Sequence, residues 1–387
     1  MSTGLTLAAL QFSLALSWTV YVVFLPALLT QAGLAPSWLP WLLMADQAVF
    51  VLADLAAGVA ADRSAAALRR LGPALLAATA VSTVAFLALP VLAGAGAAPW
   101  MLAATVVWAI SSAALRAPVA ALLGRRAARP TLPRWVAWWT LGLALAGALG
   151  PWLTVQLRGS DARLPFVLAS LALLAATAAL LRVERQWPPP VPTHPAEAAR
   201  WSRPLAWFLL AAVALGLGFQ GHAQLNAAPQ YLRFAAAAEL PAWLSLFWVA
   251  VGLALWPAGE ATRRVGAVPV LAAGAALAAL GSALAALATG LPLLAIGQAL
   301  SGAAWGAVLV SAWTAAVQVG RSGREGLSSA ALSALLALAA LLRIAAVAAQ
   351  WPQQPTVQAW LPWLPAGLWA LAALLIARTH PGRGVSP

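Results

Sequence analysis

Long apolar runs, separated by short polar or proline-containing stretches, make up almost the whole chain. An α-helix rises 1.5 Å per residue, so about 20 consecutive apolar residues cross the hydrocarbon core of a bilayer. The runs have about this length. The pattern predicts twelve membrane-spanning helices, at approximately residues 5–29, 38–61, 72–94, 99–123, 134–157, 164–183, 204–230, 241–258, 266–289, 291–318, 327–350 and 357–378.

The composition agrees with an all-α polytopic membrane protein surrounded by membrane lipids. Hydrophobic residues make up 63% of the chain and charged residues 8%, whereas a soluble protein carries about a quarter charged residues. The first apolar run has no basic segment before it and no cleavage-like site after it. We therefore interpret it as the first membrane-spanning helix and not as a signal peptide. We expect a monomer in the inner membrane of a bacterium.

The basic residues, all of them arginine, determine the predicted orientation. Most of the 22 fall in loops on one side of the predicted membrane, and the exceptions in loops on the other side are Arg158, Arg163 and Arg233. Because arginine-rich loops stay in the cytoplasm, both chain termini are predicted to be cytoplasmic. The clusters account for the net charge of +13 without a basic face, which argues against nucleic acid as a partner.

The longest predicted loop, residues 184–203, divides the chain into two parts. Its sequence, ERQWPPPVPTHPAEAARWSR, contains a proline run that prevents a continuous helix. We predict two domains of six spans each, residues 1–183 and 204–387, joined by this cytoplasmic linker. Six plus six spans are typical of transporters built from parallel structural repeats.

A short pattern of glycine, acidic residue and arginine follows the corresponding span of each half. Gly58-x-x-x-Asp62-Arg63 comes after the second span, and Glu260 precedes Arg263 after the eighth. Together with the twelve spans and the central linker, the first of these patterns resembles the signature loop of the major facilitator superfamily. The resemblance covers nearly the whole chain, and it implies a transporter that works by alternating access.

The resemblance also implies a gating role for these two turns. In the family the signature aspartate helps to lock the outward-open state, which places Asp62 against the helix that starts near Leu327, with Arg63 in the same cytoplasmic cluster. A carboxylate is favoured there by the free N–H groups of a helix N-terminus. The alternative is that Asp62 is a solvated loop charge. In this chain Ser64–Leu68 delays the next arginines relative to the family pattern.

Glycines in the fifth span give a further resemblance. Gly142-x4-Gly147-x2-Gly150-Pro151 is similar, with a spacing one residue different, to the glycine–proline motif of family exporters of the antiport type. It favours export over import. The alternative is that small residues here serve close packing of helices.

Charged residues inside the spans are costly in hydrocarbon and need partners or water. Counting from the span ends places Asp46 roughly 12 Å from the outer end of the second span. The same count places Arg343 roughly 24 Å from the inner end of the eleventh span, at a similar depth. We predict an Asp46–Arg343 pair between the two halves, with either a structural or a proton-coupling role. In the coupling hypothesis, a carboxylate released from its arginine during transport takes up a proton.

A second pair is predicted within the first half. Asp54 and Arg116 both lie in the inner third of their spans, at about 24 and 26 Å from the outer side by the same rise per residue. An ion pair that only stabilises the bundle is the favoured interpretation, because both residues belong to one half.

The seventh span is unusually polar. Gln220, His222, Gln224 and Asn226 occur at alternate positions, and nearby glycines and Pro229 allow the helix to bend or unwind. Irregular polar backbone inside a membrane is tolerated where it lines a cavity or is buried in protein. We predict a substrate or water pathway here. For His222 a neutral, hydrogen-bonded role in the bundle is the alternative, and no metal site is expected.

Further cavity candidates lie in the first and tenth spans. Gln11, Trp18 and Tyr21 fall near one stripe of the first span, and Gln298 and Trp305 lie in the tenth. If several deep tryptophans line the cavity, the substrate is apolar or aromatic. Packing or lipid contact is the alternative for each one.

These patterns favour a secondary transporter for a small organic solute over other classes of protein. No nucleophile–base pair, metal cluster or phosphate-binding loop is recognisable in the sequence. We therefore expect neither an enzyme nor a cofactor, with the proton as the candidate coupling ion. The alternatives are a proton-independent facilitator, or an assembly factor or receptor of similar fold that does not transport.

Overall fold

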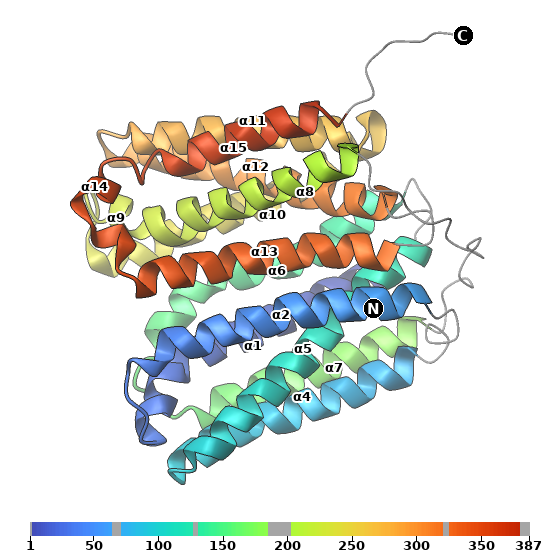
Figure 1. Ribbon diagram of the computed structural model, residues 1–387, viewed down its shortest axis with the longest axis vertical. Helices are drawn as coiled ribbons and strands as arrows, with labels where there is room; N and C mark the ends of the chain where they lie inside the picture. Colours follow the sequence, from blue (N-terminus) through green and yellow to red (C-terminus); the bar gives the residue numbers. More distant parts are fainter. Residues whose placement is uncertain (1, 64–70, 127–130, 185–202, 320–324, 380–387) are drawn as a thin grey trace.

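The computed structural model describes the backbone of residues 2–63, 71–126, 131–184, 203–319 and 325–379. It describes the side chains of residues 2–60, 74–115, 131–184, 203–318 and 326–379. This part of the chain is helical, without β-strands (Figure 1). The predicted linker lies outside the described residues, except for its two ends.

The helices of the first half match the predicted spans to within a few residues. Each is a long apolar helix that meets the length needed to cross a bilayer. Their bounds are α1 (Thr3–Gln31), α2 (Trp38–Arg63), α4 (Leu71–Gly94), α5 (Ala98–Arg126), α6 (Leu132–Gln156) and α7 (Arg163–Glu184).

The second half contains two departures from regular helices. Its seventh span consists of α8, a π-helical segment η1 and α9, and its last span is broken. The bounds are α8 (Arg203–Phe219), η1 (Gln220–Asn226), α9 (Ala227–Tyr231), η2 (Ala237–Glu239), α10 (Leu240–Val265), α11 (Ala267–Ala286), α12 (Leu291–Val319), α13 (Glu325–Ala348), η3 (Trp351–Gln353), α14 (Pro355–Gln358) and α15 (Leu364–Ala377).

Eleven helical segments of the described residues are long and apolar enough to span a membrane. The predicted twelfth span, 357–378, was too long: a continuous helix begins only at Leu364 and has 14 residues. Pro362 and Pro365 explain the difference, because proline cannot donate to the preceding turn and disfavours helical geometry in the residue before it.

The helices pack in two groups. In the first, α1 packs against α6 and α7, and α4 packs against α5 and α7. In the second, α12 packs against α10 and α11, and α15 packs against α8 and α11. The main contacts between the groups are α2 with α13 and α6 with α10. Figure 1 shows α2 and α13 side by side across the middle of the molecule.

The two ends of the bundle differ in charge. Helix α1 begins and α15 ends at one end, on the right of Figure 1. Arginines gather at the helix termini of this arginine-rich end: Arg134, Arg182, Arg203, Arg263, Arg264 and Arg378. The opposite end, called the far end below, carries Arg158, Arg163 and Arg233. This asymmetry is the one on which the predicted orientation rests.

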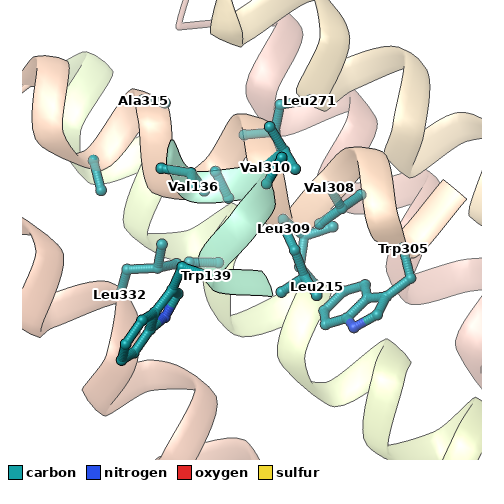
Figure 2. Packing of buried hydrophobic residues seen from close by; sticks show 14 of the residues in the cluster. Val136, Trp139, Leu215, Leu271, Trp305, Val308, Leu309, Val310, Ala315 and Leu332 are labelled. Atoms are coloured by element: carbon teal, nitrogen blue, oxygen red, sulfur yellow. The ribbon is translucent and has the colours of Figure 1, made fainter. Parts of the chain in front are cut away.

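An apolar core joins the two groups toward the arginine-rich end. Figure 2 shows Trp139 of α6 beside Leu332 of α13, in a cluster that continues through Leu309 of α12 to Leu215 of α8. These side chains are at most 9% exposed. The core therefore closes the space between the groups at this end.

Candidate functional site

A cavity of about 830 Å³ lies between the two groups of helices. It reaches the far end, where Arg158 and Ala237 line it, and the apolar core closes it in the other direction. Aromatic and polar side chains of both groups line it, including Gln11, Trp18, Gln47, Phe50, Ser82, Trp108, Ser112, Arg158, Gln220, Gln224, Phe247, Trp248, Gln298 and Arg343.

Aromatic rings of the first group form one wall of this cavity. The Trp18 and Trp108 rings are stacked, with centroids 6.1 Å apart and planes inclined by 11°. Phe50 meets Trp18 edge-on at 5.4 Å. Rings held in this way offer a rigid apolar surface to a solute at little cost in conformational entropy.

Aromatic rings of the second group form the facing wall. Phe247 and Trp248 lie edge to face at 5.5 Å, and the Trp248 ring rests against α6 at Gly147. A Cβ at Gly147 would overlap that ring. The glycine therefore lets an indole of one group approach the backbone of the other.

Two of the three span-five glycines, Gly142 and Gly147, have a packing role in this structure. Gly142 leaves no room for a side chain, since a Cβ there would meet the backbone of α1 at Ala8 and Phe12. Gly147, Gly150 and Pro151 line the cavity, and α6 continues through Pro151 as a helix.

Five of the predicted cavity residues line the cavity: Gln11, Trp18, Gln220, Gln224 and Gln298. The Oε1 atom of Gln11 is buried and has no hydrogen-bond partner within the described residues. A polar atom in this state is a ready acceptor for a donor on a solute or a water molecule.

The other four predicted cavity residues lie behind the lining. Tyr21 contacts the buried side of the Trp18 and Trp108 rings, and Trp305 stacks on Phe219 with centroids 4.7 Å apart. Asn226 donates from Nδ2 to the carbonyl oxygen of Leu361 at 2.9 Å. The spacing of these residues indicated the right helices, but not which side faces the cavity.

His222 is buried between aromatic rings. Its ring lies 5.3 Å from Trp369 and 5.8 Å from Phe247, and its Nε2 atom has no hydrogen-bond partner within the described residues. Beyond η1, Gln298 donates from Nε2 to Oε1 of Gln230 at 3.3 Å. His222 and Gln230 of this span thus pack within the second group, whereas Gln220 and Gln224 line the cavity.

The predicted pair Asp46–Arg343 is not present. Asp46 is 2% exposed and accepts a hydrogen bond from the Tyr21 hydroxyl at 2.8 Å. Arg343 donates from Nε to Oε1 of Gln220 at 2.9 Å. Helices α2 and α13 do pack together, but depth counting does not determine the direction in which each side chain points, and both find partners elsewhere.

The buried carboxylate of Asp54 reaches across the interface between the groups. It accepts a hydrogen bond from the Ser333 hydroxyl of α13 at 2.6 Å. The side chain of its predicted partner Arg116 lies outside the described residues. The hydrogen bond to Ser333 was not predicted, since serine carries no charge that depth counting would follow.

The predicted gating residues divide into two cases. Gly58 lies against the start of α13, where a Cβ would be 2.5 Å from Cβ of Ala330; the side chains of Asp62 and Arg63 lie outside the described residues. Glu260 is hydrogen-bonded to Arg263 one turn later in α10 at 2.8 Å. Both are exposed, so this pair is local to one helix.

Several lining residues were not among the predicted cavity residues. Gln47 follows Asp46 in the chain and is a polar residue in an apolar run, a signal of the kind used for the other glutamines. Phe50 and Phe247 carry no such signal, because an aromatic residue in a membrane span has the same pattern whether it faces lipid or a cavity.

The fold has close counterparts among solved structures. A bacterial homologue of the iron transporter ferroportin in the outward-facing state superposes with a TM-score of 0.76 at 14% identity, over 98% of this chain and 99% of that one. For FucP, a transporter in the outward conformation, the values are 0.72 and 12%, over 99% of each chain. For the human organic anion transporter MFSD10 they are 0.68 and 18%, over 97% and 98%. These identities establish a common fold only.

A comparison with curated protein sequences gives no match. The family model described as Major Facilitator Superfamily matches residues 7–342, most of the chain. The cavity between two groups of helices agrees with this match. The chain therefore belongs to the major facilitator superfamily, and it is a membrane transporter and not an enzyme.

Proposed function

We propose that the protein is a secondary active transporter that moves a small apolar or aromatic organic solute by alternating access. The observation that carries this proposal is the cavity with aromatic walls between the two groups, which reaches the far end and is closed at the arginine-rich end. An apolar pocket with a few polar groups is typical of sites for small organic molecules. A scaffold without transport needs no such cavity.

We further propose that the arginine-rich end faces the cytoplasm of a bacterial inner membrane and that the protein works as a monomer. With this orientation the structure corresponds to an outward-open state. We also propose export in exchange for protons, a direction that the resemblance of the glycine–proline pattern of α6 to that of antiport exporters favours. The solved structures with this fold include an iron transporter homologue, an organic anion transporter and FucP, so the fold alone leaves the solute open.

Asp46 is the proposed proton-coupling residue. It is buried, and its partner Tyr21 contacts Trp18 and Trp108, both of which line the cavity. A solute that displaces these rings also disturbs the hydrogen bond to the carboxylate. The occupancy of the cavity and the protonation of Asp46 are in this way linked through a single layer of side chains.

Proton movement in proteoliposomes tests the proposal. Purified protein is reconstituted with a pH-sensitive dye inside the vesicles, and a panel of aromatic and apolar solutes is added. We expect solute-dependent proton flux for the wild type and none for Asp46→Asn, while solute binding persists. The control is Asp161→Asn, since Asp161 is exposed in the loop between α6 and α7 and should leave the flux unchanged.

The remaining outcomes separate the alternatives. Solute movement without proton flux would indicate a facilitator and would reduce Asp46 to a structural residue. Failure of every solute to bind or move would favour an assembly factor or receptor of this fold.

A further inference from the structure

We propose that the cavity selects singly charged organic anions with an apolar or aromatic body, and that Arg343 binds the anionic group. This inference rests on the proposed function, because it specifies the solute of the same cavity. It follows from the charges on the cavity wall, from the position of Arg343 and from the surrounding rings.

The first observation is an imbalance of charge on the wall. Among the described residues, the cavity lining includes two arginines, Arg158 and Arg343, and no aspartate or glutamate. Asp46 is not among them, and its carboxylate is hydrogen-bonded to Tyr21 on the other side of the aromatic wall. A positive charge inside a membrane protein is costly without a counter-charge. A bound anion would supply the counter-charge that the wall lacks.

The second observation is the way in which Arg343 is held. Its Nε donates to Oε1 of Gln220 at 2.9 Å, and within the described residues no carboxylate forms an ion pair with it. The hydrogen bond fixes the plane of the guanidinium group but uses only one of its five N–H donors. The two terminal nitrogens remain for a carboxylate, which arginine binds in a bidentate manner.

The third observation concerns the number of charges. Arg343 lies in the last two turns of α13, toward the far end and beside Gln220, whereas Arg158 follows the end of α6 at the mouth itself. One arginine on the wall within the bundle neutralises one negative charge, and an arginine at the mouth attracts anions toward the opening. The stacked Trp18 and Trp108 and the facing Trp248 then cover the apolar part of the solute.

Binding of matched probes to the purified protein tests this selectivity. The probes are 2-naphthoate, its neutral analogue 2-naphthamide and the cation 2-naphthylmethylammonium, measured by isothermal titration calorimetry. These compounds share the same rings and differ in charge. We expect 2-naphthoate to bind at least about tenfold more tightly than the amide, which corresponds to about 1.4 kcal/mol, and the cation to bind most weakly.

Substitutions of the arginines locate the selectivity. Arg343→Gln should abolish the preference for 2-naphthoate while affinity for 2-naphthamide changes less than about twofold, and Arg343→Lys should keep part of the preference. Unchanged amide binding shows that the variant is folded. The control is Arg163→Gln, which removes a charge from the same end of the bundle but does not line the cavity.

Three results would overturn the inference. They are equal affinities of the wild type for the acid and the amide, a preference that survives in Arg343→Gln, and no binding of 2-naphthoate up to about 10 mM. Transport of the neutral amide together with any of these results would leave the proposed transporter function standing. Loss of transport for every solute despite selective binding of the acid would instead contradict the proposed function alone.

Discussion

Among the described residues, the carboxylate of Asp46 has one hydrogen-bond donor, the Tyr21 hydroxyl. Tyr21 is completely buried and Asp46 is 2% exposed, and the hydrogen bond between them is 2.8 Å long. A buried acceptor that loses its donor carries the full cost of desolvation. The pair therefore contributes to stability as well as to the proposed coupling.

Tyr21→Phe should destabilise the protein by about 1 to 3 kcal/mol, because it leaves a buried carboxylate without this donor. Thermal unfolding in detergent measures the effect. The chain has a matched control in its only other tyrosine, Tyr231, which is 1% exposed. Its hydroxyl has no hydrogen-bond partner within the described residues, so Tyr231→Phe should leave the unfolding temperature unchanged. Equal effects of the two substitutions would contradict the importance of the hydrogen bond.

At this scale the sequence predicted positions better than partners. Asp46 and Arg343 both lie in the helices predicted for them, α2 and α13, yet one bonds to Tyr21 and the other to Gln220. Depth along a span follows from counting residues at 1.5 Å each, whereas the direction of a side chain depends on the rotation of the helix about its axis. That rotation is set by packing with neighbours, which a single sequence does not show.

Among the elements, the π-helical segment η1 positions the polar residues of the seventh span. Within Gln220–Asn226 the turns are wider than in an α-helix, and π-helical turns occur frequently at functional sites. Gln220 at its start contacts Arg343, and Asn226 at its end donates to the loop before α15. The segment thus connects the cavity wall to the broken last span.

Asn226→Leu tests this connection. The substitution keeps a similar volume but removes the donor to the carbonyl oxygen of Leu361, so we expect a loss of about 1 kcal/mol in the free energy of unfolding. Denaturation of purified protein measures it. Gln224→Leu is the control, because Gln224 is exposed toward the cavity. A stable Asn226→Leu variant would show that the loop before α15 is held by other contacts.

The sequence predicted elements well where apolar runs are uninterrupted. The first six spans agree with α1 to α7 to within a few residues. The seventh span was expected to bend or unwind at its glycines and Pro229, and it adopts a π-helical segment instead. The last span was predicted too long, because hydropathy counts the apolar residues around Pro362 as if they were helical.

For the whole molecule, the state observed depends on contacts that close the arginine-rich end. Gly58 of α2 fits against Ala330 and Gly326 of α13, and Ser333 of α13 donates to Asp54 of α2. Alternating access requires these contacts to separate while the far end closes. Changes at either contact should shift the balance between the two states.

Gly58→Ala should favour opening of the arginine-rich end. The added Cβ would lie 2.5 Å from Cβ of Ala330 and 2.7 Å from the carbonyl oxygen of Gly326, so α2 and α13 must move apart. Spin labels are attached to Val155→Cys and Ala237→Cys, one on each group at the far end. Because the far end closes when the arginine-rich end opens, the distance between the two labels should become shorter. The chain has no cysteine of its own, which keeps the labelling specific. Gly94→Ala is the control, since nothing lies within 4 Å of a Cβ there.

Ser333→Ala should also favour opening of the arginine-rich end, but more weakly than Gly58→Ala. It removes one hydrogen bond between the groups, worth about 1 kcal/mol, which changes the ratio of the two states about fivefold. The same pair of spin labels measures the populations. The control is Ser282→Ala, which removes a hydroxyl that donates to Ala279 within its own helix α11. It should leave the distances between the spin labels as they are in the labelled protein without this substitution. An unchanged distribution in Ser333→Ala would mean that this hydrogen bond does not hold the groups together.

The candidate site was predictable from sequence only in part. Polar residues in apolar runs, such as Gln11, Gln220 and Gln298, led to the cavity, because a buried amide needs a partner or water. The aromatic walls were expected only conditionally, since tryptophan is common at membrane interfaces and in packed cores as well. The closure at one end depends on helices distant in the chain and had no signal in the pattern of residues.

The π-helical segment has a consequence for insertions and deletions. A π-helical turn accommodates an extra residue within an α-helix, so deletion of one residue, such as Ala223, would restore a regular α-helix. The side chains beyond the wide turn would then keep their faces, whereas deletion of one residue from the regular helix α8 would rotate all later side chains by about 100°. After that deletion in α8, Asn226 and Gln230 would turn away from Leu361 and Gln298, which they now contact. The number of residues in this span is thus as much a determinant of the polar network as their identity.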